Sequence, residues 1–225
     1  MYYQSYKKRP INVWKLIIKS ISILFCLLIV LASGLMFYCN TMLEYYPVSQ
    51  NSMQPLINPN GVDEDYVYIS NDTQNLNYKD IIIYDHNGTL VIKRIIAKEG
   101  DKIMIKQIEN GQYRFFIMYK DDTNWIQIEE DYIKNKNVYE YSYFEFYEEN
   151  YNKQFYLDDQ GNKYLLVEEN QIFCAGDNRL NSNDCIDYGA QSVDDVVGNV
   201  VYIIHKNQFK IWQILMQFLG ITQWK

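Results

Sequence analysis

The chain has 225 residues and a formal net charge of −7, with 22 tyrosines and only 4 prolines. A chain of this length accommodates one medium-sized domain, or a domain with an insertion. The negative charge argues against a nucleic-acid-binding protein, because such proteins neutralise phosphates with clustered Lys and Arg. The abundance of tyrosine favours strands over a helical bundle.

The N-terminal segment has the charge distribution of a membrane anchor. Residues 1–43 contain basic but no acidic side chains, and the 24 residues from 20 to 43 carry no charge at all. An apolar helix of about 20 residues spans the hydrocarbon core of a bilayer. Basic residues before the apolar run place the N-terminus in the cytoplasm, so the chain after Glu44 is expected outside the cell membrane.

A cleaved signal peptide is the alternative interpretation, with Ala32-Ser33-Gly34 as its cleavage site. The apolar core of a signal peptide usually has about 7–15 residues, fewer than this run. The apolar character also continues past Gly34 as far as Phe37. We therefore expect a retained single-pass anchor over residues 15–43, preceded by a cytoplasmic segment, 1–14.

Several short segments after the anchor have the composition of β-strands. They are rich in Ile, Val and Tyr, and turn residues separate them. The predicted strands cover residues 65–70, 80–85, 89–97, 101–108, 163–169, 171–175 and 196–204. Between two of them, Asn87-Gly88 predicts a hairpin with a type I′ turn. The fold class is therefore mainly β.

Residues 105–170 differ in composition from the segments around them. They contain 14 acidic and 7 basic side chains, many Tyr and Asn, and an alternating pattern at 138–147. This segment is predicted to be an inserted, solvated β-rich cap rather than a functional site. It divides the external β-domain into a first part, 44–104, and a second part, 171–207.

The C-terminal tail, residues 208–225, places apolar residues on one helical face. Only 14 uncharged residues follow Lys210, which is short for a spanning helix. One interpretation is an amphipathic helix at the membrane surface, with Trp212 and Trp224 at the headgroups. The other is a helix packed on its own domain.

Cysteine and histidine give little indication of a site. Cys174 and Cys185 lie in the external part, where a disulfide is chemically permitted and two unpaired thiols are an equal alternative. The histidines, His86 and His205, are isolated, and no Cys–His cluster suggests a metal. We expect neither a cofactor nor a metal.

The candidate nucleophiles are then Ser and Thr hydroxyls, which need a base. In VIKRII, residues 91–96, period-two alternation places Lys93 on the same face as Val91 and Ile95. Burial there would lower the pKa of the lysine towards the range of a general base. An edge-strand lysine with its ammonium in water is the alternative interpretation.

Three short stretches resemble conserved boxes of the bacterial type I signal peptidases. They are NSMQPLI (51–57), IKRIIAKEGD (92–101) and GDNRLNSND (176–184), the last a turn of short polar side chains that can fix an irregular loop. The spacing of 41 residues from Ser52 to Lys93 resembles that of the Gram-positive branch. The resemblance covers residues 15–103 and 171–203 and leaves the cap unmatched.

The resemblance implies an antiparallel β catalytic domain with a Ser–Lys dyad, in which Ser52 is the nucleophile and Lys93 the general base. Ser182 matches the hydroxyl that orients the lysine amine, and Asp177 and Arg94 match a structural ion pair. Shallow apolar pockets would take small substrate side chains. The matched pocket residues are Met53, Ile57, Val91 and Ile92 for the first position before the cut, and Tyr46, Val48 and Ile83 for the third.

Two positions depart from the family pattern. Gln50 stands where many relatives have Ser or Gly, so its amide is only a candidate for the second oxyanion donor. The family's Asp-Ser-Arg after the loop serine is here Asp184-Cys185-Ile186. The arginine that would pair with Asp184 is therefore missing, and the loop must be held by other contacts.

The resemblance implies a membrane-anchored serine endopeptidase that removes signal peptides from secreted preproteins after small residues. Its partners would be preprotein signal peptides, the lipid bilayer and, as a further candidate, the secretion translocon. The main alternative is a catalytically weak or inactive relative that assists surface-protein or pilus assembly. A self-cleaving repressor-type peptidase shares the dyad, but residues 1–43 offer no DNA-binding domain.

Overall fold

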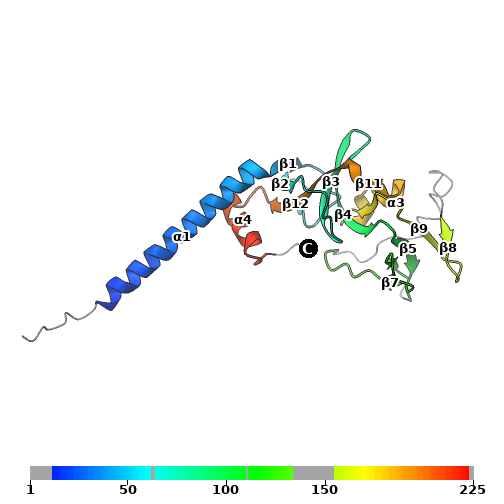
Figure 1. Cartoon of the computed structure of the whole chain (residues 1–225), viewed down its shortest axis with the longest axis horizontal. Helices are drawn as coiled ribbons and strands as arrows, with labels where there is room; N and C mark the ends of the chain where they lie inside the picture. Colours follow the sequence, from blue (N-terminus) through cyan, green and yellow to red (C-terminus); the bar gives the residue numbers. More distant parts are fainter. Residues whose placement is uncertain (1–11, 62–63, 110, 134–154, 223–225) are drawn as a thin grey trace, which may run out of the picture.

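The computed structural model describes residues 12–61, 64–109, 111–133 and 155–222 (Figure 1). Its helices are α1 (Val13–Met42), α3 (Cys185–Tyr188) and α4 (Lys210–Phe218), with 3-10 turns at Arg179–Asn181 and Val193–Asp195. Its strands are β1 (Glu44–Val48), β2 (Asp65–Ser70), β3 (Ile81–His86), β4 (Thr89–Lys98), β5 (Lys102–Gln107), β6 (Tyr113–Met118), β7 (Ile126–Gln127), β8 (Tyr156–Leu157), β9 (Lys163–Leu166), β10 (Gln171–Ala175), β11 (Gln191–Ser192) and β12 (Val196–Ile204).

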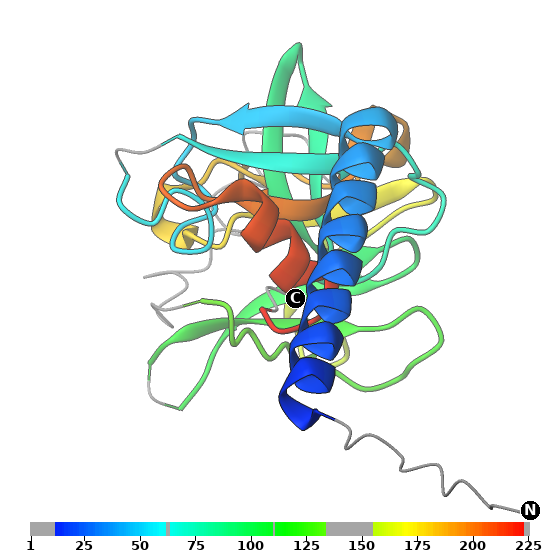
Figure 2. The same ribbon diagram turned by 90° about the vertical axis from the view of Figure 1, so that its left-hand side faces the viewer.

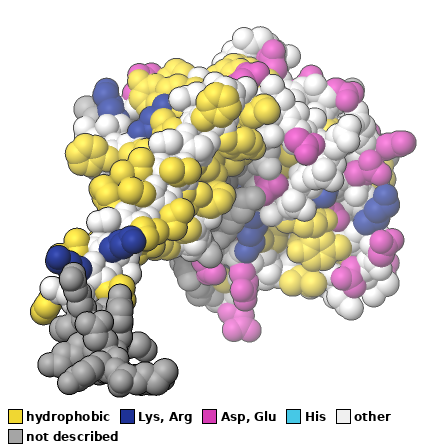
Figure 3. All heavy atoms as spheres, turned by 60° about the vertical axis from the view of Figure 1, so that its left-hand side comes forward, with side chains coloured by type: hydrophobic (Ala, Val, Ile, Leu, Met, Phe, Trp, Pro, Cys, Tyr) yellow, Lys and Arg dark blue, Asp and Glu magenta, His cyan; other side chains and the backbone are white. Residues whose placement is uncertain are grey.

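The helix α1 has 30 residues and extends away from the body of strands. Asn12 caps its first turn by accepting a hydrogen bond from the Lys15 N–H at 3.3 Å. Among the described residues it is the one helix long and apolar enough to cross a membrane. Hydrophobic side chains cover its surface, and basic side chains lie towards its N-terminal end (Figure 3).

The strands form two sheets, and every strand pair in the described part of the chain is antiparallel. The larger sheet has seven strands in the order β1-β2-β12-β3-β4-β10-β11. The smaller sheet has five described strands, in the order β7-β6-β5-β9-β8, all of which come from the segment between β4 and β10. The prediction of a mainly β, antiparallel fold behind an apolar helix is confirmed.

The strand boundaries follow the hydrophobic pattern closely. The strands β2, β10 and β12 have the predicted bounds. β4 differs from its predicted bounds by one residue at one end, β3 and β5 differ by one residue at each end, and β9 ends three residues before its predicted end. The hairpin at Asn87-Gly88 is also confirmed, since His86 pairs with Thr89 and both turn residues have positive φ, 53° and 83°. The strand β6 was not predicted, and the alternating stretch 138–147 lies outside the described residues.

The helix α4 packs on β12 and touches the end of α1, and Figure 2 shows the two helices side by side. Ile214 of α4 is buried in one cluster with Leu35 and Cys39 of α1. The outward face of α4 carries the exposed side chains of Ile211 and Trp212. α4 therefore packs on its own domain, as one interpretation of the tail has it. Contact of its outward face with the membrane stays a prediction, and Trp224 lies outside the described residues.

Candidate active site

Ser52 lies in the turns between β1 and β2, and only 5% of its surface is exposed. Met53 and Ile57 from the same turns are fully buried in a cluster with Val48 and Ile83. A hydrogen bond from the Ile57 N–H to the Met53 carbonyl, 3.1 Å long, closes one of these turns. The apolar residues around Ser52 therefore tie its backbone to the core of the larger sheet.

Asn58 and Asp65, which the sequence analysis did not single out, fix the far end of these turns. The Asn58 amide donates to the Val48 and Gln50 carbonyls at 2.6 and 3.0 Å. The Asn58 N–H donates to the Asp65 carboxylate at 2.8 Å, and the Asp65 N–H donates to Asn58 Oδ1 at 2.7 Å. Asn58 has a φ of 54°, which Asn tolerates better than most residues. The Asn-Pro pair at 58–59 is the turn signal that could have identified it.

Lys93 lies in β4, and its Nζ donates a hydrogen bond of 2.8 Å to Ser52 Oγ. Only 2% of the lysine is exposed. Burial lowers the pKa of the Lys93 ammonium from its ordinary value, and the negative charge of nearby Asp184 opposes this shift. The structure therefore brings a serine hydroxyl and a lysine with a lowered pKa into direct contact.

A loop of residues 176–184 encloses Ser52 from the other side. The Asn178 N–H donates to the Ser52 carbonyl at 2.8 Å, and the Asn178 side chain donates to the Asn51 carbonyl at 3.1 Å. A Cβ at Gly176 would lie 2.6 Å from the Ser52 carbonyl oxygen, closer than real Cβ atoms approach. Glycine is thus required where the loop meets the Ser52 turn.

Asp184 is the N-cap of α3 and holds the end of this loop without an arginine partner. Its carboxylate accepts hydrogen bonds from the Ile186 N–H (3.1 Å), the Gly176 N–H (2.8 Å) and the Ser182 hydroxyl (2.7 Å). Asp187 completes a capping box by accepting from the Asp184 N–H at 2.8 Å. Burial raises the pKa of the Asp184 carboxyl. The orientation of the lysine amine by Ser182 stays a prediction.

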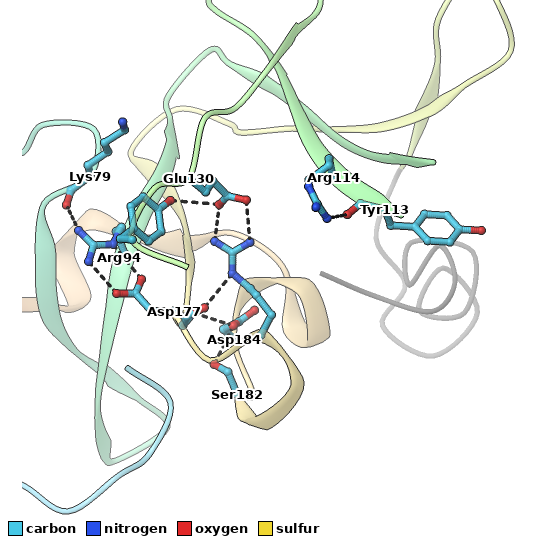
Figure 4. Close-up of polar contacts among 11 residues, drawn as sticks. Lys79, Arg94, Tyr113, Arg114, Glu130, Asp177, Ser182 and Asp184 are labelled. Carbon is cyan, nitrogen blue, oxygen red and sulfur yellow. Dashed lines mark hydrogen bonds and ion pairs between the residues drawn. The ribbon is translucent and has the colours of Figure 1, made fainter. Parts of the chain in front are cut away.

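Two buried ion pairs also hold the loop. Arg94 donates from Nε and Nη2 to the two oxygens of Asp177, at 2.8 and 2.7 Å, and both side chains are fully buried. This is the pair that the resemblance implies. Arg179 pairs with Glu130 of the predicted cap, and these side chains are 1% and 6% exposed. Figure 4 shows Glu130 reaching towards the loop that carries Asp177. No sequence signal links the second pair, because 49 residues separate its members.

A cleft of about 930 Å³ contains both side chains of the Ser–Lys contact. Its walls come from the turn after β1, the first half of β4, and the loop with α3. The ladder between β10 and β4 covers Arg94 to Lys98, so the described edge of β4 from Thr89 to Lys93 borders the cleft. In the described ranges, no group of His, Cys, Asp and Glu could hold a metal ion, and the four cysteines are free thiols.

The residues matched to substrate binding fall into two groups. Most of them are core residues with at most 4% exposure, namely Val48, Met53, Ile57, Ile83 and Ile92. Val91 is half-buried on the cleft wall, and Tyr46 is half-buried with its hydroxyl donating to Glu44 at 2.6 Å. Gln50 lines the cleft and donates to the Leu90 carbonyl at 3.5 Å. The structure thus brings Val91 and Gln50 to the cleft and places the others beneath or beside it.

The chain is similar to known proteins in sequence and in structure. Residues 17–205 match the family model described as signal peptidase, peptidase S26. No match was found among curated proteins. The crystal structure of a signal peptidase I from Enterococcus faecalis V583 is similar at 22% sequence identity, covering 56% of this chain and 96% of that chain, with a TM-score of 0.34. Since the family model spans most of its length, the chain belongs to the signal peptidase family, peptidase S26.

Proposed function

We propose that the chain is a membrane-anchored type I signal peptidase of the Gram-positive-like branch, with Ser52 as nucleophile and Lys93 as general base. The observation that carries the proposal is the 2.8 Å contact between Lys93 Nζ and Ser52 Oγ, made by a lysine that is 2% exposed. A buried lysine is unfavourable unless it is neutral or paired, and a neutral amine beside a hydroxyl is a general base.

The reaction then proceeds in two steps. Neutral Lys93 takes the proton of Ser52 Oγ as that oxygen attacks the scissile carbonyl, and the resulting ammonium protonates the leaving amine. Water, deprotonated by Lys93, next hydrolyses the acyl ester on Ser52 and releases the signal peptide. The Ser52 backbone N–H is the first oxyanion donor, and the Gln50 amide, which lines the same cleft, is the candidate second donor.

The substrate binds as an extended strand. The edge of β4 from Thr89 to Lys93 borders the cleft and offers backbone groups to a peptide, the β-addition mode of recognition. The side chain of Val91 lies on the cleft wall. Met53 and Ile57 are fully buried and do not line the cleft, so the preference for small side chains next to the cut rests on the family resemblance.

The anchor places this cleft near the membrane. Basic residues before the apolar run of α1 direct its N-terminus to the cytoplasm and the β-domain to the outside. Ser52 lies eight residue steps after Glu44, so the serine is within roughly 30 Å of the end of the anchor. The end of a preprotein signal peptide emerges at this distance from the membrane, whether the peptide arrives from the lipid bilayer or from the translocon.

The test is cleavage of preproteins by the purified full-length chain in detergent. We expect the wild type to cut after a small residue, and Ser52→Ala and Lys93→Ala each to lower the rate by about 10⁴-fold or more, as when a covalent nucleophile or its base is removed. Mass spectrometry of the products checks the cleavage site. A folded wild type that leaves several preproteins uncut would replace the proposal by a non-catalytic assembly factor.

A further inference from the structure

We propose that Glu130, in the predicted cap, is a positioning residue for the site: it holds Arg179 and, through Arg179, the loop that encloses Ser52. The inference rests on the proposed peptidase function for its kinetic consequences. It assigns a role to a segment whose sequence predicts only a solvated cap. The segment of residues 128–133, here called the strap, carries Glu130.

One guanidinium connects the strap to the nucleophile's surroundings. Arg179 donates from Nη1 to Glu130 Oε2 at 3.3 Å, and its Nη2 pairs with the other carboxylate oxygen. The same guanidinium donates from Nε to the Gly176 carbonyl at 2.8 Å. A Cβ at Gly176 would lie 2.6 Å from the Ser52 carbonyl oxygen, and the Asn178 N–H donates to that carbonyl at 2.8 Å. The Arg179 side chain and the backbone of residues 176–178 thus link Glu130 to the backbone of Ser52.

Contacts with the rest of the domain fix the strap in place, so the position of Glu130 does not depend on its attraction to Arg179 alone. Ile133 is buried, and the Ile128 N–H donates to the Phe115 carbonyl of β6 at 2.9 Å. The Tyr132 hydroxyl donates to Glu130 Oε1 at 3.0 Å. The ring of Tyr132 also covers the guanidinium of Arg94 at 4.1 Å. The strap therefore contacts both of the arginines whose ion pairs hold the loop.

The charge of Glu130 has a specific task. Arg179 lines the cleft, although its side chain is 1% exposed, and the loss of the Glu130 carboxylate would remove a two-oxygen ion pair from this buried guanidinium, which is strongly unfavourable. Without Glu130, the guanidinium would leave its place to reach water and release the Gly176 carbonyl. Glu130 is not among the described residues that line the cleft, so its loss should disturb the loop without removing a contact that Glu130 itself makes with the substrate.

The kinetic test compares Glu130→Ala with Glu129→Ala, since Glu129 is an exposed acidic neighbour in the same strap. We expect Glu130→Ala to lower kcat by about 10-fold to 100-fold, the effect of a misplaced reacting group. We expect KM to change by less than about two-fold, and Glu129→Ala to match the wild type in both constants. The isosteric Glu130→Gln, which keeps an acceptor for Arg179, should lose less. A wild-type kcat in folded Glu130→Ala would overturn the proposal.

A double variant tests whether Glu130 acts through Arg179. The kcat of Glu130→Ala/Arg179→Ala should equal that of Arg179→Ala alone, because the second substitution removes nothing further. A double variant whose loss in kcat equals the product of the two single losses would contradict the proposal.

Hydrogen exchange separates this proposal from the proposed function. In the catalytically silent Ser52→Ala background, Glu130→Ala should speed exchange of the Gly176 and Asn178 amides, whereas Glu129→Ala should not. The exchange experiment tests the positioning role of Glu130 even if the wild type cleaves no preprotein. In that case only the proposed peptidase function fails. Unchanged exchange of both amides in Glu130→Ala would refute the positioning role.

Discussion

At the scale of single residues, the burial of Lys93 lowers the stability of the folded chain but suits the proposed role of this lysine as a base. Its ammonium would be stable in water, yet its side chain is 2% exposed and burial lowers its pKa. An unfolded chain therefore binds a proton at this lysine over a pH range in which the folded chain does not. Strained ionisable groups of this kind are retained mainly where they are used.

We predict that Lys93→Met is inactive but more stable than the wild type at pH 7, by about 0.5–2 kcal/mol, the usual range for a stabilising substitution. The unfolded wild type binds more protons than the folded one between the lowered pKa and the ordinary value of 10.5, so its stability rises with pH across that window. The advantage of Lys93→Met should therefore shrink as pH rises through the window. Urea unfolding at several pH values measures it. Equal stability at every pH would contradict the prediction, and exposed Lys206→Met is the control.

At the scale of elements, the loop of residues 176–184 packs so closely against the Ser52 turn that a methyl group added at Gly176 would not fit. We predict that Gly176→Ala lowers kcat by about 100-fold or more, because the new Cβ would push the Ser52 carbonyl away. Gly198→Ala is the matched control: its Cβ would lie 2.7 Å from the Ser70 carbonyl oxygen, in the sheet and outside the cleft. Both variants should lose stability in thermal unfolding, but only Gly176→Ala should lose activity per folded molecule.

The elements differ in how far the sequence predicted them, and the reason is the range of the interactions involved. The strands β2 and β12 follow from local runs rich in Ile, Val and Tyr that are bounded by turn residues, and the hairpin at Asn87-Gly88 follows from the backbone freedom of two residues. The contact between Ser52 and Lys93 was expected only from the resemblance, since no local pattern brings together residues 41 positions apart.

The sequence analysis missed two kinds of contact. One kind joins residues far apart in the chain, and the other replaces an ion pair by hydrogen bonds. Glu130 reaches Arg179 only because the strap folds back over the loop, which composition does not indicate. The missing arginine partner of Asp184 is replaced by backbone N–H groups and the Ser182 hydroxyl, a role that any N-cap Asp can take without an obvious signal.

At the scale of the whole molecule, α1 and α4 together fix how deep the β-domain sits, provided that α1 spans the membrane as proposed. Lys19 is the last charged residue before Glu44. Leu35 lies 16 residues beyond Lys19, or about 24 Å along the helix, which is less than the hydrocarbon thickness of about 30 Å. Because Ile214 packs in one cluster with Leu35, α4 must lie at the level of the outer leaflet.

The side chains of α4 agree with this depth. Its two interior glutamines point inwards, where Gln213 bonds the backbone of His205 and Gln217 that of Ile203. The outward residues are apolar and exposed, with Trp212 at 58% and Phe218 at 53%. In water this arrangement would be inverted, because surface helices normally turn their polar residues outwards. The acyl chains of the outer leaflet are the surroundings that suit it.

We therefore predict that Trp212 contacts lipid. In a full-length protein whose other three tryptophans are replaced by Phe, lipids brominated on their acyl chains should quench Trp212 fluorescence at least about two-fold, because indole at the interface lies within reach of the acyl chains. A protein retaining only Trp125, in the smaller-sheet region, should be unaffected. A third protein with a single Trp in place of Phe25 reports whether α1 is inserted. Quenching at position 25 without quenching of Trp212 would contradict the prediction. It would show that α1 is inserted in the membrane while the outward face of α4, which packs in one cluster with α1, faces water.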